Sequence, residues 1–121
     1  MLTNWEHTVL YTGMTNHLPF RLLEHYAEID GGFGSRYKTF YLVWFEETKY
    51  VRNAIEREKE IKLLTRARKD ALIEAQNPLW HHLNEELLGN WPPAAEQVEE
   101  MMAYRKHERT RIGWAKRDGT E

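Results

Sequence analysis

Cysteine is absent from this 121-residue sequence, so the chain can form neither a disulfide bond nor a thiolate zinc site. Long hydrophobic runs are absent as well, whereas a membrane-spanning helix takes about 20 consecutive apolar residues. The N-terminus carries no basic segment followed by an apolar stretch, so we expect no signal peptide. Together these absences predict a cytoplasmic protein without a membrane partner.

The chain also lacks a large excess of either charge. Its net charge is −2, which gives no overall attraction to nucleic acid. Basic residues nevertheless gather in two stretches, 57–69 and 105–117. Local basic stripes can bind phosphate groups even when the whole chain is slightly acidic. The alternative is a pair of solvated helix faces, which is the commoner meaning of charge runs.

Apolar residues make up 41% of the sequence and aromatic residues 12%, with five tryptophans, which argues against disorder. The length suits one domain with an appended helix. Asn90-Trp91-Pro92-Pro93 forms a rigid break, so we place a domain at 1–88 and a C-terminal helical extension at 89–121. The helix expected at 94–112 has a narrow apolar stripe, which favours packing on the domain edge or on a protein partner.

A strand, a turn and a helix follow one another near the start of the chain. Val9–Tyr11 is a short β-forming run, and Gly13 then tolerates backbone angles that other residues avoid. A helix is predicted to open near Asn16 and Pro19, because asparagine caps helices and proline fits a first turn. A helix N-terminus attracts phosphate, and Arg21 lies one turn further on. The stretch therefore predicts a phosphate-binding site.

The remaining elements follow from composition and hydrophobic periodicity. The clearest strand is 39–45, which is aromatic and β-branched and apolar on both faces. We expect it to be the central strand, or at least to be covered on both sides. Met1–Thr3 is the stub of a further strand, joined to the next strand by a hairpin. Helices are predicted at 49–64 and 65–75, the second capped by Thr65.

One carboxylate lies on an apolar helix face. Glu58 falls near the middle of a stripe that consists of Val51, Ala54, Ile55 and Ile61. A buried carboxylate is costly unless it is paired, protonated or bound to a metal. One alternative is a structural salt bridge to Arg21 or Lys62. The other is a metal ligand, because a carboxylate beside a phosphate-binding arginine suits magnesium-dependent phosphodiester chemistry.

Several polar residues allow more than one interpretation. His25 shares a face with apolar residues and could be a hydrogen-bonded core histidine. Asn77 precedes a proline that discourages helix, which leaves its amide to orient a neighbouring group. His81 and His82 are adjacent, and adjacent helical positions do not face each other, so we expect no metal pair there.

A glycine-rich loop at 30–38 ends the first helix and carries two aromatic residues with the cations Arg36 and Lys38. Flexible backbone, stacking surface and positive charge suit contact with a nucleic-acid strand. An ordinary helix end followed by a connecting loop would have the same residues, so the two interpretations stay open.

The order of these features resembles the small stand-alone members of the GIY-YIG nuclease superfamily. Tyr11-Thr12-Gly13, Arg21 and His25 are similar to the second half of the signature, with Thr12 in place of the usual isoleucine. Further motifs follow in the family's order and rough spacing: Arg57-Glu58-Lys59, Ile61-Lys62, the basic cluster 66–69, Leu72-Ile73-Glu74 and Asn77-Pro78-Leu79-Trp80. The resemblance covers approximately residues 1–88.

The resemblance implies an α+β fold, in which a small three-stranded antiparallel sheet with a truncated first strand is flanked by helices. It implies a metal-dependent DNA endonuclease that uses Mg²⁺ or Mn²⁺. By resemblance, Tyr11 would be the general base or water-orienting phenol, and Arg21 would hold the scissile phosphate. Glu58 would bind the metal, Asn77 would be a positioning amide, and His25 would join the catalytic group. The residues expected to contact DNA are Arg36, Lys38, Lys62, Arg66, Arg68 and Lys69.

One part of the signature is missing. In the family, a first tyrosine precedes the second by ten or eleven residues, and counting back from Tyr11 lands on Met1 or one position before it. Either the natural chain starts upstream, or it has lost the first half of its signature. We therefore expect weaker cleavage and lower stability than in the relatives. The rival hypothesis is a nucleic-acid-binding or protein-interaction module that keeps the fold without catalysis.

Overall fold

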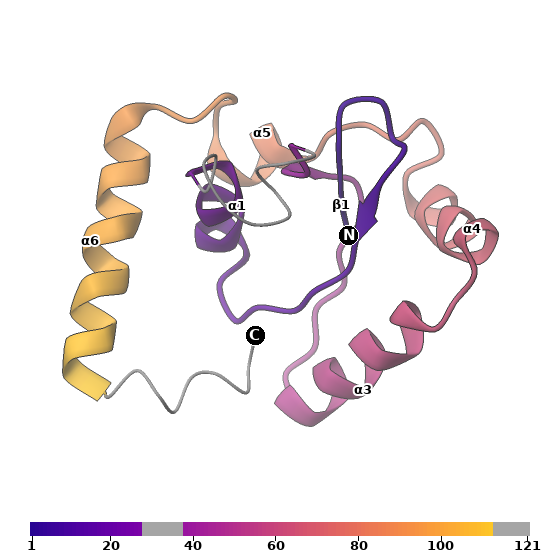
Figure 1. The fold of residues 1–121 in the computed structure, drawn as a ribbon, viewed down its shortest axis with the longest axis horizontal. Coiled ribbons are helices and arrows are strands. Elements are labelled where there is room, and N and C mark those ends of the chain that lie inside the picture. Colours follow the sequence, from indigo (N-terminus) through magenta and orange to yellow (C-terminus); the bar gives the residue numbers. More distant parts are fainter. Residues whose placement is uncertain (28–37, 113–121) are drawn as a thin grey trace.

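The computed structural model describes residues 1–27 and 38–112 and confirms the α+β class (Figure 1). Its strands are β1 (Leu2–Thr3), β2 (Leu10–Tyr11) and β3 (Tyr41–Leu42). Its helices are α1 (Leu18–Ala27), α3 (Val51–Lys62), α4 (Arg66–Gln76), α5 (Asn84–Leu88) and α6 (Ala95–Ile112). Within these ranges, no helix combines the length and apolarity needed to cross a membrane.

The sheet is antiparallel with the strand order β2-β1-β3, so the N-terminal strand lies in the middle. Leu2 pairs with Tyr11 on one side and with Leu42 on the other. The prediction of a three-stranded antiparallel sheet with a short first strand is confirmed. The expectation that 39–45 forms the central strand is wrong, because β1 holds that position and only β3 of this segment joins the ladder.

Segment 39–45 has the composition of an inner strand because the chain around α5 covers its outer edge. The Asn84 amide accepts a hydrogen bond from Leu42 N at 2.8 Å and donates one to Phe40 O at 2.7 Å. Leu83 N donates to Leu42 O at 2.7 Å. These bonds satisfy backbone groups that an open edge would leave to water. Val43 and Trp44 pack in one buried cluster and Leu42 in the other, so both faces of the segment are covered.

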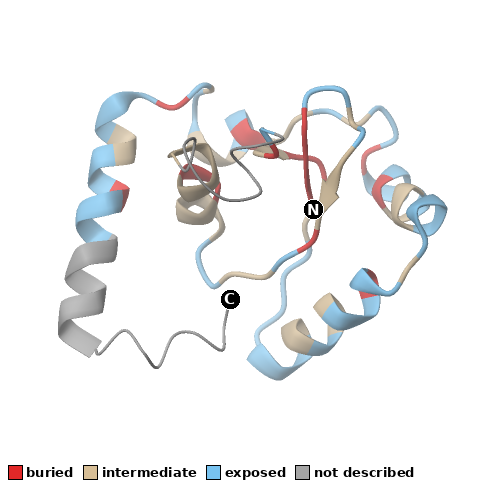
Figure 2. Cartoon of the chain, in the orientation of Figure 1, coloured by how far each residue is buried: buried red, intermediate tan, exposed pale blue. Residues whose placement is uncertain are grey.

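Helices cover both faces of the sheet, and the buried residues gather where they meet it (Figure 2). One cluster joins α3 and α4 to the sheet through Met1, Val43, Trp44, Ile61 and Ile73. The other joins α1 to the sheet through Leu2, Leu22 and Leu42, with the α5 region packed against it. Successive residues of a strand point to opposite faces, so Met1 and Leu2 belong to different clusters.

The helix caps that the sequence predicts are only partly confirmed. The Thr65 side chain accepts a hydrogen bond from the backbone three residues on, which confirms it as the cap of α4. The expectation that Asn16 caps α1 is wrong, because His17 takes that position. Its carbonyl accepts from Arg21 N at 3.0 Å, and its ring Nδ1 accepts from Phe20 N at 3.4 Å.

The predicted C-terminal helix is present as α6, which packs against α1 (Figure 1). Met101 is buried, and the ring of Tyr104 meets that of Phe20 edge-on with centroids 4.9 Å apart. Met102 from the predicted stripe is 54% exposed. The division of the chain at 88/89 and a protein partner for this helix stay predictions.

Candidate active site

Tyr11 lies at the end of β2 and turns its ring toward α1. The ring meets that of His25 edge-on, with centroids 5.2 Å apart. The ring also lies over Gly13, because a Cβ placed there would come within 3.0 Å of the Tyr11 Cε1 atom. The glycine thus permits the close approach that sets the direction of the phenol, which explains why this turn has no side chain at that position.

His25 lies one helical turn after Arg21 on α1 and contacts Tyr11. Burial, and secondly the positive charge of Arg21, lower the pKa of His25 from 6.5 to about 4. The imidazole is therefore neutral at pH 7. A neutral ring in this place can accept or donate a hydrogen bond beside Tyr11 without repelling the guanidinium.

The lowered pKa of His25 predicts a pH dependence of stability. Its folded pKa lies below its unfolded pKa, so below pH 6.5 the unfolded chain binds the proton more readily. The stabilising effect of His25 is complete above pH 6.5 and is lost as the pH falls to about 4. The change is on the order of 3 kcal/mol, at about 1.4 kcal/mol per pKa unit.

The measurement is urea unfolding between pH 7 and pH 4, comparing the wild type with His25→Gln. The difference in unfolding free energy between the two proteins should shrink as the pH falls, because carboxyl titrations elsewhere are common to both. A difference that stays constant over this range would contradict the low pKa.

Arg21 lies in the first turns of α1, where the helix N-terminus favours anions. Its Nη1 lies 3.2 Å from Glu24 Oε1, and both side chains are less than one quarter exposed. Of the two salt bridges considered for Glu58, to Arg21 or to Lys62, the described residues contain the one to Lys62. A phosphate bound at Arg21 would compete with Glu24 for the guanidinium.

Glu58 lies three residues before the buried Ile61, on the side of α3 that faces the core. Its side chain is 15% exposed, and its Oε2 atom is buried without a hydrogen-bond partner in the described parts of the chain. Lys62 places its Nζ 3.6 Å from this oxygen. The salt-bridge alternative thus exists as an i,i+4 ion pair, but such pairs contribute only about 0.3–0.5 kcal/mol.

A magnesium or manganese ion fits this donor. Mg²⁺ prefers oxygen ligands, keeps several waters and often uses only one or two carboxylates. The Glu58 oxygen is buried, unbonded and accompanied by a long ion pair, so an additional cation would complete its environment. Among residues 1–27 and 38–112, no three His, Asp or Glu side chains form a metal cluster, so water would supply the remaining ligands.

The chain that leaves β2 runs between α1 and α3 in Figure 1. Leu10 packs with the cluster of α3 and α4, whereas Tyr11 packs with the cluster of α1. Consecutive residues of β2 therefore connect the helix that carries Arg21 with the helix that carries Glu58. This places the phenol, the guanidinium and the carboxylate on three neighbouring elements.

Asn77 is buried at the end of α4, and backbone groups occupy its amide. Its Nδ2 donates to Val43 O and to His81 O, both at 2.9 Å, and its Oδ1 accepts from His81 N at 3.0 Å. The side chain therefore ties the end of α4 to the strand segment that follows β3. Any positioning role of Asn77 in catalysis would act through this backbone.

We expect Asn77→Ala to lower the free energy of unfolding by about 2–4 kcal/mol, because buried backbone groups lose their partners at about 1–3 kcal/mol each. Thermal unfolding measures the effect. Asn90→Ala is the matched control, since Asn90 is exposed and makes one bond to Pro92 O at 3.2 Å. Equal stability losses in the two variants would contradict the structural role of Asn77.

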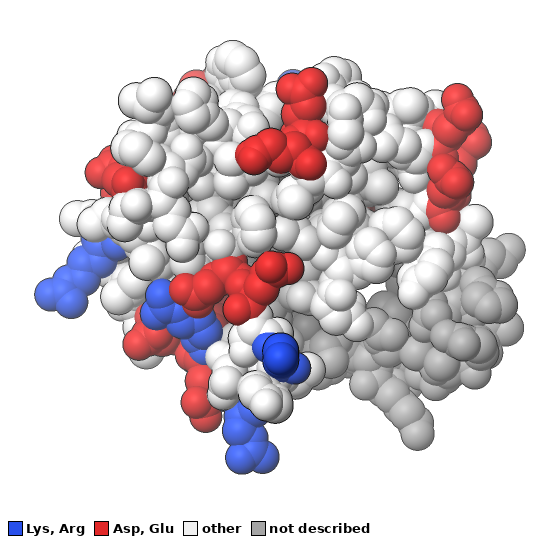
Figure 3. Space-filling view, turned by 180° about the vertical axis from the view of Figure 1, so that it is seen from behind, with Lys and Arg blue, Asp and Glu red and all other residues white. Residues whose placement is uncertain are grey.

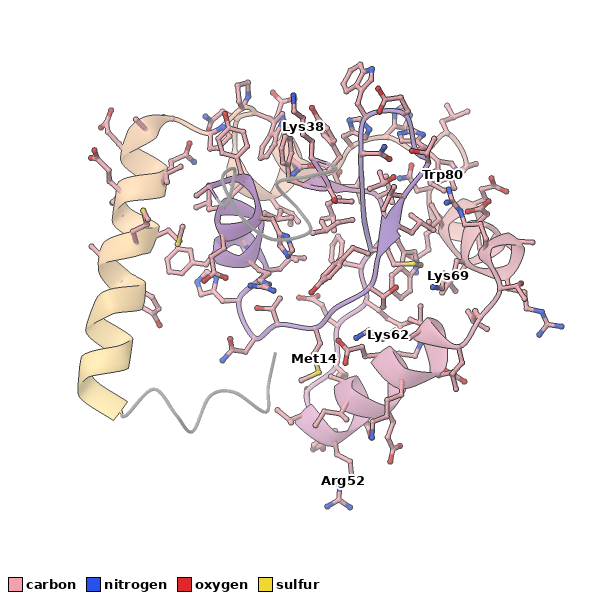
Figure 4. The ribbon with its side chains drawn as sticks, viewed as in Figure 1. Met14, Lys38, Arg52, Lys62, Lys69 and Trp80 are labelled. Carbon is pink, nitrogen blue, oxygen red and sulfur yellow. The ribbon has the colours of Figure 1, made fainter. Side chains whose placement is uncertain are left out.

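The cations predicted to contact DNA lie in different environments. Lys62 pairs with Glu58, and Figure 4 shows it on α3. Arg68 is exposed and Lys69 half-buried on α4, and neither forms an ion pair with another described residue. Lys38 is exposed just before β3, with a φ of 53°. Arg36 lies outside the described residues.

Arg66 ties two parts of the fold together through hydrogen bonds. Its Nη1 and Nη2 donate to the carbonyls of Thr8 and His7 at 2.9 and 2.6 Å, and its Nε donates to Asp70 at 2.8 Å. The guanidinium also lies 6.0 Å from the centre of the Trp80 ring. Arg66 therefore links the β1–β2 turn to α4, and the run of basic residues in the sequence did not indicate this structural role.

Basic and acidic side chains are mixed over α3 in Figure 3. Arg57, in the predicted basic stretch, binds Glu46 at 2.8 Å and also pairs with Glu60. Pairing with these carboxylates raises the pKa of Arg57. Much of the predicted basic stripe on this helix is thus neutralised locally, which favours the solvated-face interpretation for it.

The structure also joins two histidines that the sequence did not connect. His7 Nε2 and His82 Nε2 lie 3.0 Å apart, although the residues are 75 positions apart in the chain. Burial, then the charges of His7 and His81, lower the pKa of His82. The adjacent pair of His81 and His82 drew attention in the sequence, but no local spacing could indicate the partner on the β1–β2 turn.

The described residues form a three-stranded antiparallel sheet covered by helices, with Tyr11 on β2, Arg21 on α1 and Glu58 on α3. The model of the GIY-YIG catalytic domain matches residues 1–71, more than half of the chain, and the chain belongs to this family. The family consists of nucleases. No curated protein and no solved structure matches the chain significantly. The predicted family is confirmed, and Asn77 lies beyond the matched range.

Proposed function

We propose that this protein is a metal-dependent DNA endonuclease that hydrolyses phosphodiester bonds. The proposal rests on the family and on one observation above all, the buried Glu58 oxygen that has no hydrogen-bond partner in the described chain. A carboxylate kept in this state on a core-facing helix position costs stability, which is the usual sign of a functional group.

The surroundings of the three residues near β2 and α1 suggest a catalytic role for each. Arg21, at the start of α1, would bind the oxygens of the scissile phosphate through paired hydrogen bonds, with the helix N-terminus adding to the attraction. Tyr11 would orient the attacking water through its phenol or, in the phenolate form, act as the general base that accepts the proton of that water. His25 is neutral and would hold the Tyr11 side chain in position by the edge-on ring contact.

Glu58 would hold one Mg²⁺ or Mn²⁺ ion, and that ion, when bound, would stabilise the charge that develops at the phosphate and the leaving oxygen. Lys62 Nζ lies 3.6 Å from Glu58 Oε2, and this oxygen accepts no hydrogen bond from the described chain, so it remains available to a ligand. The residues proposed to contact the DNA backbone are Arg36, Lys38, Lys62, Arg66, Arg68 and Lys69. Contacts of this kind make affinity depend on salt.

A catalytically impaired binding module is the second candidate. Ten residues before Tyr11, one of the two positions where the family has its first signature tyrosine, this sequence has Met1, and loss of that tyrosine would impair catalysis. β1 is short, but it pairs with both β2 and β3.

The experiment is incubation of the purified chain with supercoiled plasmid, with Mg²⁺, with Mn²⁺ and with a chelator. The proposal predicts nicked and linear products with either metal and none with the chelator. DNA binding in a gel-shift assay without cleavage in either metal would favour the binding module.

A further inference from the structure

We propose that an aromatic patch on the surface, formed by Trp5, Phe40, Tyr41, His82 and Trp91, binds unpaired DNA bases by stacking. The inference rests on the proposed function, because it names the kind of DNA that the site would act on. That substrate is DNA with a single-stranded stretch beside the scissile phosphate. The aromatic patch uses none of the residues assigned to cleavage.

Separate segments of the chain contribute to the aromatic patch. Trp5 lies on the β1–β2 turn, Phe40 and Tyr41 lie at the start of β3, His82 lies between α4 and α5, and Trp91 lies between α5 and α6. Segments this far apart in the sequence meet only through the fold. No local run of residues could therefore indicate the patch.

The rings of the aromatic patch contact one another without a break. Trp5 meets Tyr41 edge-on with ring centroids 5.6 Å apart, and it meets His82 edge-on at 5.4 Å. Tyr41 stacks on His82 at 4.3 Å and lies 4.9 Å from Phe40. Trp91 continues the row, 5.8 Å from Phe40 and 6.1 Å from Tyr41. Because these contacts hold the rings in place, binding a flat ligand costs little conformational entropy.

The aromatic patch faces solvent although its rings are largely apolar. Trp5 is 66% exposed, and the other four residues are half-buried. The turn that carries Trp5 is nevertheless fixed, because Asn4 Oδ1 accepts hydrogen bonds from Thr8 N at 2.9 Å and from Val9 N at 3.0 Å. A large apolar side chain that a fixed turn keeps in water indicates a binding surface.

The backbone around the aromatic patch is strained. Within the described ranges, the residues other than glycine that have a positive φ are His7 at 61°, Lys38 at 53° and Trp80 at 56°. All three border the patch. His7 lies against His82 and stacks on Trp80, and Lys38 precedes Phe40 by two residues. Figure 4 shows Lys38 and Trp80 at the same end of the protein. Such strain persists where the surroundings enforce it, and it gathers at functional sites.

Unpaired bases suit the chemistry of this surface. Stacking of bases on aromatic side chains accepts any base, because every base has a π-face. Charge at the aromatic patch is mixed. Lys38 is an exposed cation at its border, whereas burial, then Tyr26 and Glu6, raise the pKa of Tyr41, so a carboxylate that repels phosphate lies nearby. A duplex hides its bases and offers phosphates, so it would gain little here. A single strand can stack, and a nucleic acid is the expected ligand in a family of nucleases.

The aromatic patch also lies near the residues assigned to cleavage. Tyr11 pairs with Leu2 in the sheet, and Trp5 follows Leu2 by three residues. At about 3.3 Å per residue, these span on the order of 10 Å. A DNA strand that passes Tyr11 can thus place a base on the patch a few nucleotides further along.

The test compares the binding of a labelled oligothymidylate and of a duplex of equal length to the full chain. Fluorescence anisotropy gives the affinities, and a chelator prevents cleavage. Trp5→Ala should weaken oligothymidylate binding about 5-fold or more, as the loss of one stacked base does, and should leave the duplex affinity unchanged. The dependence of both affinities on salt should stay the same, because no phosphate contact is lost.

Leu63→Ala is the matched control, because Leu63 is an apolar residue, 86% exposed, in the turn between α3 and α4. It should bind both DNAs as the wild type does. Trp5→Phe keeps an aromatic ring and should retain most of the affinity. In the wild type, the indole N–H signal that is missing from the NMR spectrum of Trp5→Phe should move when oligothymidylate is added, which tests the contact without relying on the alanine variant.

Equal oligothymidylate affinities of the wild type and Trp5→Ala would overturn the inference alone, since plasmid cleavage is measured separately. A wild-type dimer that Trp5→Ala dissociates, with unchanged DNA affinity, would instead assign the aromatic patch to contact between copies of the chain. Failure of the wild type to bind either DNA would overturn both this inference and the proposed function.

Discussion

Glu58→Gln is expected to abolish metal-dependent cleavage of plasmid DNA while leaving DNA binding nearly intact. The amide keeps the shape of the side chain but removes the negative charge that would hold the ion. Loss of groups that merely support a metal ligand costs about 10- to 100-fold, so loss of the ligand itself should cost more. Cleavage rates with Mn²⁺ and gel-shift affinities measured side by side give the answer.

Glu56→Gln is the matched control for this variant, because Glu56 lies on the same helix but is exposed. It should cleave at the wild-type rate. Thermal stability of Glu58→Gln should be unchanged or slightly raised, since the ion pair with Lys62 is weak and a buried charge disappears. A strongly destabilised Glu58→Gln protein, with a wild type indifferent to metal, would identify Glu58 as a structural residue.

Arg21→Lys should slow cleavage nearly as much as Arg21→Ala, by about 10²–10³-fold, which is the usual cost of losing a donor to the developing charge. Lysine keeps the positive charge but loses the planar pair of donors that matches a phosphate. The two rates are measured under single-turnover conditions, with stability checked by thermal unfolding.

Arg52→Lys provides the control for Arg21, because Arg52 is an exposed cation at the start of α3 and Figure 4 shows it pointing away from the protein. It should cleave normally. Near-normal cleavage by Arg21→Lys would show that charge alone is sufficient there, and the paired hydrogen bonds would then have no part in the account.

The sequence predicted the fold well where local rules decide. Thr65 begins α4 as a threonine cap should, and the core-facing position of Glu58 follows from the helical period. The sequence failed where distant segments decide. Segment 39–45 looked like a central strand from its apolar residues, but β1 is central, and Asn84, some forty residues later, bonds to the backbone at the outer edge of the segment.

In the candidate site, too, the local features could be predicted and the long-range ones could not. Tyr11, Arg21 and Glu58 each lie in a segment whose secondary structure follows from its local sequence, so the strand and the two helices that carry them could be predicted. The partners of buried polar groups could not. The Asn77 amide is engaged by backbone groups, and Arg66, which is predicted to contact DNA, also binds the carbonyls of the β1–β2 turn. Only the three-dimensional arrangement shows which polar groups already have partners.

The central claim is that one metal ion binds at Glu58, and the most direct measurement is a Mn²⁺ titration followed by electron paramagnetic resonance. Free Mn²⁺ gives a strong signal that weakens when the ion binds, so the number of sites can be counted in the wild type and in Glu58→Gln. The account predicts one Mn²⁺ per chain that disappears with Glu58→Gln. Equal Mn²⁺ binding by the two proteins would contradict it.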